Sequence, residues 1–195
     1  MSYKNILAAF LYLAASGASA AVCGASEATL LEQVAPKLTG SWSVTNGAGM
    51  LSMAGRTMIL PAGNNSTARI TQTAEGMTIS GGEIGPDSYP LTFVAEQKWR
   101  LDPNGDLHNL ETQEALFGTE HKVEPLTRDE LELLSNCPDG NIPQLYAMGE
   151  FQGEEGTVRF ELFLFMTSDS HMYGVVKGNL LAMGATAKRV TLFTR

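Results

Sequence analysis

Positive charge is scarce in this sequence: 13 Lys and Arg residues stand against 21 Asp and Glu residues, and the formal net charge at pH 7 is −8. Proteins that bind nucleic acid need clustered Lys and Arg to displace counterions from phosphate. A basic amphipathic stretch of the kind that binds anionic lipid is also missing. The charge balance therefore argues against a nucleic-acid partner and against stable membrane insertion.

Motifs for catalysis and metal binding are missing as well. Neither a G-x-S-x-G nucleophile elbow nor an H-E-x-x-H metalloprotease motif occurs. Residues 168–171 (SDSH) contain the residue types of a catalytic triad, but neighbours in one tight turn cannot take up triad geometry. His108 and His121 are not spaced like zinc ligands. We therefore expect no enzyme, no catalytic residue, no metal site and no cofactor.

Two segments have features of metal sites, and both have a simpler interpretation. Residues 102–106 (DPNGD) offer oxygen ligands, but Leu107 stands where a calcium loop of the EF type needs glycine, so a hairpin turn is expected. Met50, Met53 and Met58, with the pair at 171–172 (HM), could bind copper. On a strand, however, positions 50 and 53 point to opposite faces, so the methionines are expected to fill the core.

The first twenty residues have the features of a signal peptide. Lys4 precedes an apolar run over residues 6–15, and residues 18–20 (ASA) are small enough for signal peptidase. The run is shorter than the roughly 20 apolar residues of a membrane span. We expect residues 1–20 to be removed, residues 21–195 to form a single domain, and the protein to be exported, either periplasmic or secreted.

Cysteine is rare, with Cys23 and Cys137 the only two. In an exported protein an even count favours a disulfide. Lipid attachment at Cys23 is the alternative, but the preceding residue is Val22, whereas lipoprotein signals need a small residue there. We expect a Cys23–Cys137 disulfide.

Short apolar segments separated by Gly, Pro, Asn and Asp predict an all-β protein, and gaps of two to six residues favour an antiparallel meander. A short N-terminal helix, capped by Ser26 and carrying Leu30, Leu31 and Val34 on one face, is expected to end at Pro36. A helical insertion over about residues 107–142 is expected to hold a helix that starts at a Thr127–Glu130 capping box and stops at Pro138. The expected strands are 41–45, 57–60, 68–73, 77–80, 89–97, 98–101, 144–152, 157–166, 171–178 and 189–194.

The clearest period-two pattern lies in residues 157–166. Phe163 and Phe165 share its outer face, which must be covered by another element or contact a partner. On the preceding strand Ala147 and Gly149 point inward, and such small residues leave space inside a barrel. The inner face of 157–166 carries Val158, Phe160, Leu162, Leu164 and Met166.

Three short motifs resemble those of the lipocalins and the wider calycin group. Residues 40–42 (GSW) resemble the G-x-W motif, and residues 167–173 (TSDSHMY) are similar to the T-D-Y-x-x-Y turn, with one extra residue and without the first Tyr. Residues 192–195 (LFTR) resemble the last barrel strand, whose Arg packs across the tryptophan. Such a cation–π contact is worth about 0.5–2 kcal/mol. The resemblance implies a closed, lipocalin-like barrel in which Gly40, Trp42 and Arg195 hold one end.

The calycin resemblance further implies that a small apolar or amphipathic ligand binds inside the barrel. The alternative is a protein-binding module of the cell envelope or a protease inhibitor, suggested by the helical insertion and by the outward pair Phe163 and Phe165. A filled interior with an exposed apolar patch would favour that alternative. The candidate ligand-binding residues are chosen from the inward apolar and small positions. They are Phe160, Leu162, Leu164, Ala147, Gly149 and Val176.

Overall fold

The computed structural model describes residues 22–94 and 125–195, apart from the side chain of Ala48. Within these residues, no helix has the length and apolar character needed to cross a membrane. Several expectations lie outside the described residues: the signal peptide at 1–20, the end of the 89–97 strand, the strand at 98–101, the turn at 102–106, and His108 and His121.

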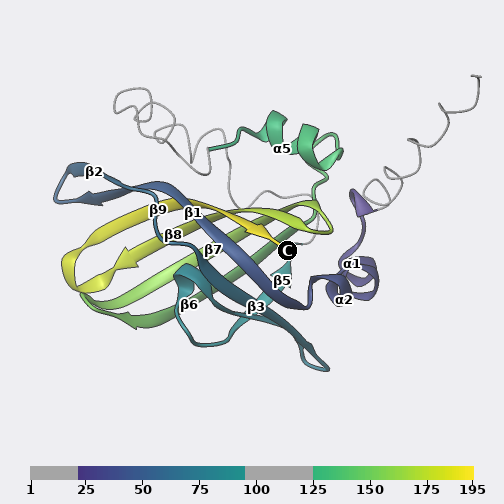
Figure 1. Ribbon diagram of the computed structural model, residues 1–195, viewed down its shortest axis with the longest axis horizontal. Coiled ribbons are helices and arrows are strands. Elements are labelled where there is room, and N and C mark those ends of the chain that lie inside the picture. Colours follow the sequence, from purple (N-terminus) through teal and green to yellow (C-terminus); the bar gives the residue numbers. More distant parts are fainter. Residues whose placement is uncertain (1–21, 95–124) are drawn as a thin grey trace, which may run out of the picture.

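The described residues form a nine-stranded antiparallel sheet that closes on itself because β1 pairs with β9 (Figure 1). Every strand except β2 belongs to the closed barrel, while β2 pairs with the second half of β1 as a hairpin. The prediction of an all-β antiparallel barrel is confirmed. The strands are β1 (Gly40–Met53), β2 (Arg56–Leu60), β3 (Ser66–Thr73), β4 (Gly76–Gly81), β5 (Tyr89–Phe93), β6 (Gln144–Gly153), β7 (Gly156–Ser168), β8 (His171–Leu180) and β9 (Ala185–Thr194).

Strand β1 is much longer than residues 41–45, the range predicted from sequence. The Asn-Gly-Ala-Gly stretch at 46–49 reads as a turn, but it forms a bulge, and pairing with β9 continues on both sides of it. Gly49 is needed there, because a Cβ would collide with the carbonyl oxygen of Lys188. Because the pairing with β1 continues beyond the bulge, β9 begins at Ala185, four residues before its predicted start at Arg189.

Two short helices, α1 (Glu27–Gln33) and α2 (Ala35–Leu38), precede β1. Ser26 caps α1 as predicted, its hydroxyl accepting from the Thr29 N–H at 3.3 Å. The prediction that Pro36 ends the helix is wrong: Pro36 lies in the first turn of α2, where its missing N–H costs no hydrogen bond. Leu31 is also not on the buried face, since it is 36% exposed.

Helix α5 (Arg128–Ser135) confirms the capping box. The Thr127 hydroxyl accepts from the Glu130 N–H at 3.3 Å, and the Glu130 carboxylate accepts from the Thr127 N–H at 2.8 Å. The helix ends at Asn136 in the left-handed conformation, just before Pro138.

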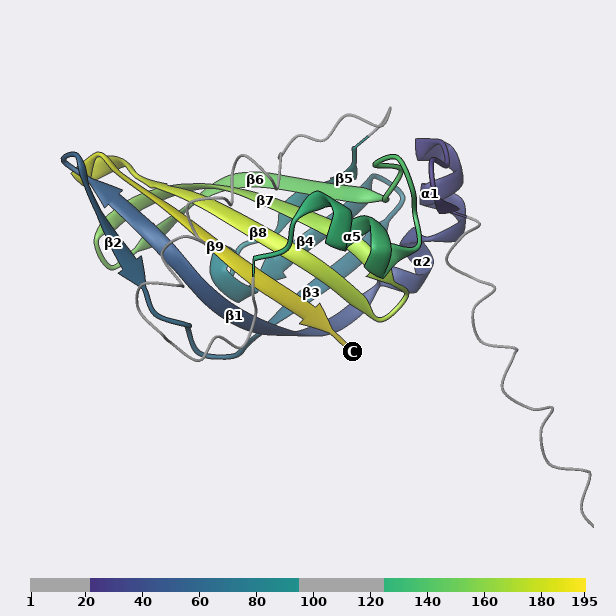
Figure 2. The same ribbon diagram turned by 90° about the horizontal axis from the view of Figure 1, so that it is seen from above.

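The outer face of β6–β9 carries its own buried cluster, over which α5 lies (Figure 2). Phe163 and Phe165 belong to it and are 2% and 1% exposed, and Leu131 of α5 packs with them. The sequence left open whether this outer face is covered by another element or contacts a partner. The burial of both rings shows that it is covered. Met50 also belongs to this cluster whereas Met172 belongs to the inner core, so these two residues fill the core on opposite sides of the sheet.

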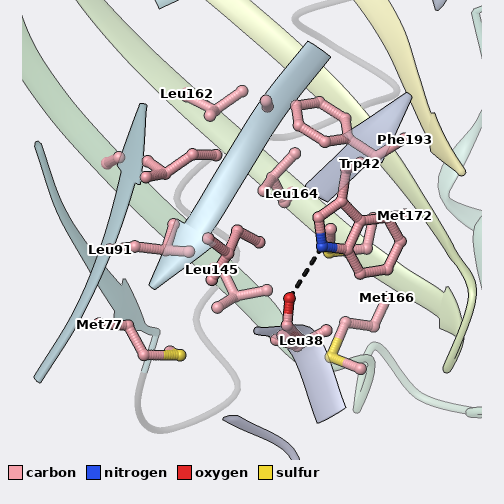
Figure 3. Close-up of a cluster of buried hydrophobic side chains, with 14 of the residues drawn as sticks. Leu38, Trp42, Met77, Leu91, Leu145, Leu162, Leu164, Met166, Met172 and Phe193 are labelled. Atoms are coloured by element: carbon pink, nitrogen blue, oxygen red, sulfur yellow. Dashed lines mark hydrogen bonds between the residues drawn. The ribbon is translucent and has the colours of Figure 1, made fainter. Parts of the chain in front are cut away.

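The inner cluster lies inside the barrel and includes residues of α1 and α2, which close one end (Figures 2 and 3). Leu38 of α2 is 0% exposed, and Leu30 and Val34 of α1 reach the same core. The opposite end is formed by the β1–β2, β6–β7 and β8–β9 turns and is called the hairpin end below.

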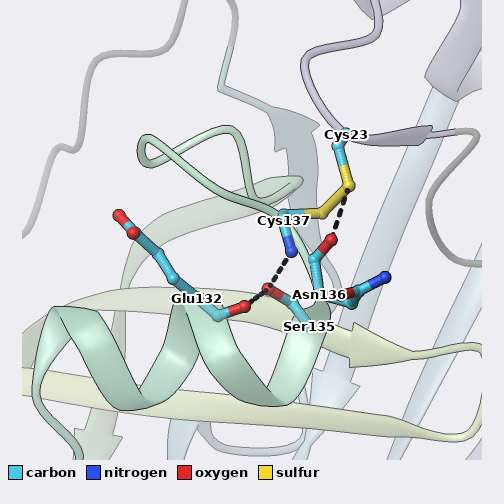
Figure 4. Close-up of a disulfide and its surroundings, with 5 residues drawn as sticks. All are labelled: Cys23, Glu132, Ser135, Asn136 and Cys137. Atoms are coloured by element: carbon cyan, nitrogen blue, oxygen red, sulfur yellow. Dashed lines mark hydrogen bonds between the residues drawn. A yellow bond between two sulfur atoms is a disulfide. The ribbon is translucent and has the colours of Figure 1, made fainter.

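The predicted Cys23–Cys137 disulfide is present, with a Cα–Cα distance of 5.4 Å (Figure 4). Cys23 lies just before α1, and Cys137 follows α5. The bond therefore connects the helices that close the barrel to the helix that covers its outer face.

Candidate ligand-binding site

The strand register arranges the inward side chains in rows that run around the barrel, because directly paired residues point to the same face of a sheet. Row 1, nearest α1 and α2, contains Leu145, Leu164, Gly174, Thr191 and Asn46. Row 2 contains Ala147, Leu162, Val176, Arg189 and Gly49. Row 3, nearest the hairpin end, contains Gly149, Phe160, Gly178, Ala187 and Leu51.

All six residues nominated from sequence lie in these rows, on the adjacent strands β6, β7 and β8. Gly149 and Val176 are half-buried. The deeper four are enclosed by neighbouring side chains, so a ligand reaches them only by displacing those neighbours, and their role as ligand contacts stays a prediction. These four are Phe160 at 1%, Leu162 at 1%, Leu164 at 0% and Ala147 at 1% exposed.

The space beside Gly149 is occupied by the ring of Tyr89. A Cβ on Gly149 would collide with that ring and would lie 3.1 Å from Phe160. The two rings meet edge to face with centroids 4.7 Å apart, and the Tyr89 hydroxyl donates to the Glu150 carbonyl at 2.9 Å. Burial, with the nearby carboxylate of Asp87, raises the pKa of the Tyr89 hydroxyl. The expectation that Gly149 leaves free space is therefore wrong.

Gly149→Ala is expected to destabilise the protein by about 1–3 kcal/mol, because the added methyl forces the Tyr89 ring out of its position. Gly178→Ala is the matched control, since it flanks Phe160 on the other side and its Cβ would lie 3.7 Å from the nearest atom. Chemical denaturation of both variants tests this. Equal stabilities of the two would contradict the assignment of Tyr89 to this space.

Trp42 closes the barrel end near α1 and α2 (Figure 3). It is 0% exposed, and its indole Nε1 donates to the Leu38 carbonyl at 2.8 Å. The guanidinium carbon of Arg195 lies 4.5 Å from the ring centroid, and the same group donates to the backbone carbonyls of Lys37, Thr39 and Asp169. Gly40 begins the strand with φ +130°. These contacts describe a structural end of the barrel.

At the hairpin end the apolar inner face is partly exposed. Leu51 pairs with Met58 of β2, so the β1–β2 hairpin continues the inner face beyond row 3. Met58 is 47% exposed, and Leu51, Phe151 and Val176 are half-buried. We call these four residues the hairpin-end surface.

Sequence reasoning missed most of the hairpin-end surface, although a signal for it exists. Ala54 and Gly55 form a two-residue turn with φ of 50° and 74°, and apolar residues lie on both sides of it. That pattern is typical of a β-hairpin.

Arg189 is an inward-pointing cation that sequence reasoning also missed. Its guanidinium lies 3.9 Å from the Glu83 carboxylate on η2 (Gly82–Ile84) and donates to the Pro61 carbonyl at 3.3 Å. The side chain is 16% exposed. The sequence pattern does not indicate that Arg189 points inward. Its outward neighbour Val190 is as apolar as the core residues, so polar and apolar residues do not alternate there in the expected way.

Two polar atoms in row 1 are buried without a partner among the described residues: Asn46 Oδ1 and Thr191 Oγ1. Both residues are 1% exposed, and they are directly paired across β1 and β9. Buried polar groups in proteins nearly always have a hydrogen-bond partner. This pair is therefore an exception that needs an explanation.

The turn at 168–171 contains no triad. The Ser168 and Ser170 hydroxyls lie 3.2 and 2.9 Å from His171 Nδ1. Asp169 instead pairs with Lys37 at 3.0 Å.

Comparisons with known proteins give similarity at the level of structure. No family model and no curated protein sequence matches the chain. An S-type phycobiliprotein lyase from Guillardia theta is similar over 92% of this chain and 97% of its own, with 11% identity and a TM-score of 0.40. A DUF3598-family protein of unknown function from Nostoc punctiforme is similar over 83% of this chain and 48% of its own, with 9% identity and a TM-score of 0.33.

The expectation that this protein is not an enzyme does not hold as an exclusion. The exclusion rested on missing sequence motifs, which cover only a few chemistries. Because catalytic sites are built onto folds in many ways, missing motifs do not exclude an enzyme. We withdraw that exclusion.

Proposed function

We propose that this protein is an exported, calycin-like barrel that binds a small apolar or amphipathic ligand at the hairpin end. The observation that carries the proposal is the apolar inner cluster, against which the half-buried Phe151 and Val176 pack, together with Leu51 and the exposed Met58 on the same face of the sheet. Exposed apolar surface that lies next to a buried apolar core favours an apolar ligand, since binding removes that surface from water.

The disulfide supports the exported part of the proposal, because such bonds persist in oxidising compartments. Candidate contacts are ordered by depth. Val176 and Gly149 are half-buried, whereas Leu162 and Phe160 become contacts only if the ligand displaces the side chains that cover them.

The protein, purified, unfolded to release bound lipid and refolded, is expected to bind the neutral fluorescent probe N-phenyl-1-naphthylamine saturably. Met58→Asp is expected to weaken this binding about tenfold, since it places a carboxylate on the apolar surface and tenfold corresponds to about 1.4 kcal/mol. Thr57→Asp is the matched control: it introduces the same charge at the adjacent exposed residue, which points to the opposite face of β2. Absence of saturable binding would refute the proposal, and equal losses in both variants would place the probe elsewhere.

A protein-binding module is the second candidate. Its original motivation is weakened, because Phe163 and Phe165 are covered. A different observation favours it: Leu133 and Leu134 of α5 are 80% and 56% exposed. Failure of apolar probes to bind, together with a partner that co-purifies from the native envelope and is lost in Leu133→Glu, would support this candidate.

A further inference from the structure

The unpartnered atoms of Asn46 and Thr191 lie in a barrel interior that is otherwise mostly apolar. The Thr191 hydroxyl occupies the space over Gly174, where a Cβ would lie 2.5 Å from it, 3.0 Å from Leu164 Cδ2 and 3.4 Å from Phe193 Cε2. Its surroundings therefore include an aliphatic and an aromatic side chain. A valine in this place would fill the same volume without burying a hydroxyl, so the hydroxyl does not serve packing.

The orientation of the Asn46 amide is determined by its other contact. Nδ2 donates to the Asn64 carbonyl at 2.7 Å and lies 3.5 Å from the Ser66 hydroxyl. The reverse orientation would place two acceptor oxygens 2.7 Å apart, which is unfavourable. The unpartnered atom is therefore Oδ1, an acceptor, and it needs a donor.

The two residues together define the chemistry of a ligand group. Asn46 Oδ1 accepts one hydrogen bond, and the Thr191 hydroxyl can donate one. An alcohol hydroxyl completes both contacts at once, since it donates to Oδ1 and accepts from Thr191. A carboxylate has no proton to donate and would place a negative charge against Oδ1.

Row 2 connects this pair to the proposed ligand surface. Val176 and Arg189 of row 2 lie one row closer to the hairpin end than Thr191. The positive charge of Arg189 is already opposed by Glu83 at 3.9 Å. A chain that enters across Val176 therefore reaches Thr191 and Asn46 next, after displacing the side chains that now close both atoms to solvent.

We propose that Asn46 Oδ1 and Thr191 Oγ1 anchor the hydroxyl group of an apolar alcohol that binds inside the barrel. The proposal rests on the proposed function and names the ligand class for it. Without a ligand the two polar atoms have no hydrogen-bond partner among the residues that the structure describes, which carries a cost to stability that ligand binding removes.

The test compares three ligands of equal chain length, 1-decanol, its methyl ether and decanoate, as competitors of the fluorescent probe. Wild type is expected to bind decanol about tenfold more tightly than the ether, since the ether cannot donate to Oδ1. Thr191→Val is expected to weaken the binding of decanol about threefold to tenfold, because the hydrogen bond from Thr191 to the ligand oxygen is lost, and to raise the unfolding midpoint. Thr191→Ser, which retains the hydroxyl, is expected to restore the affinity for decanol.

Thr186→Val is the matched control for the exchange of threonine for valine, since Thr186 is exposed on the outer face of the same strand. It should change neither the affinity for decanol nor the midpoint. Equal binding of decanol and ether by wild type, or an unchanged affinity for decanol in Thr191→Val, would overturn the anchor. If decanoate binds most tightly of the three ligands, Arg189 binds the polar group of the ligand, and the proposed anchor is overturned.

The result separates the two proposals. If all three ligands bind with equal affinity, the anchor is wrong and the proposed function stands. If none of them and no probe binds, the proposed function is wrong and the anchor fails with it. A midpoint that rises in Thr191→Val without any effect on binding identifies the pair as a buried defect or a water site, and contradicts the anchor.

Discussion

Replacing Cys23 and Cys137 together by alanine is expected to lower the free energy of unfolding by about 4 kcal/mol. The two cysteines are 114 residues apart in sequence, so the bond removes many conformations from the unfolded chain. In the native state it connects the α1 end of the barrel to α5. Urea denaturation of the oxidised wild type and of the double variant measures the difference.

Reductant supplies the internal control for this prediction. Wild type in reductant should approach the stability of the double variant, while the variant itself should not respond. A loss below about 1 kcal/mol would show that the unfolded chain is not appreciably constrained by the bond, as occurs when the denatured state keeps residual structure.

Trp42→Ala is expected to destabilise the protein by about 4 kcal/mol, within the range for truncation of a buried aromatic residue. The indole is 0% exposed, so its removal leaves a cavity among Leu38, Leu164 and Phe193 (Figure 3). The variant also leaves the Leu38 carbonyl without its hydrogen bond from Nε1. Denaturation followed by circular dichroism, which does not depend on tryptophan fluorescence, measures the loss.

Trp42→Phe separates the two contributions. It retains much of the buried volume but removes the indole N–H, so a loss of about 1–2 kcal/mol is expected from the unpaired carbonyl and the smaller ring. A loss as large as that of Trp42→Ala would contradict the division between packing and hydrogen bonding. Neither variant that still folds should change probe affinity, because Trp42 lies at the end of the barrel opposite Met58.

The fold was predictable because its signals are local. The alternation in 157–166, the Thr127–Glu130 capping box and the even cysteine count each predicted a feature that the structure has. The errors came where local signals conflict. The glycines at 46–49 are typical of a turn, but pairing with β9 keeps them in a strand, and Pro36 starts α2 instead of ending a helix.

The candidate site was predictable only in part, for the same reason. Periodicity placed Phe160, Leu162 and Leu164 on the inner face, but could not show that Tyr89 fills the space at Gly149. That contact joins strands far apart in sequence, and the local pattern around Gly149 contains no information about it.

By itself, the sequence determined the fold class, the two faces of each strong strand, the helix caps and the disulfide, since these depend on residue type and short-range spacing. Tertiary structure alone decided which residues meet. Closure of β1 on β9 places Asn46 beside Thr191 inside the barrel, and α5 covers Phe163 and Phe165. The physical reason is that strand register and the packing of helices on a sheet are set by contacts between distant segments, which no local pattern encodes.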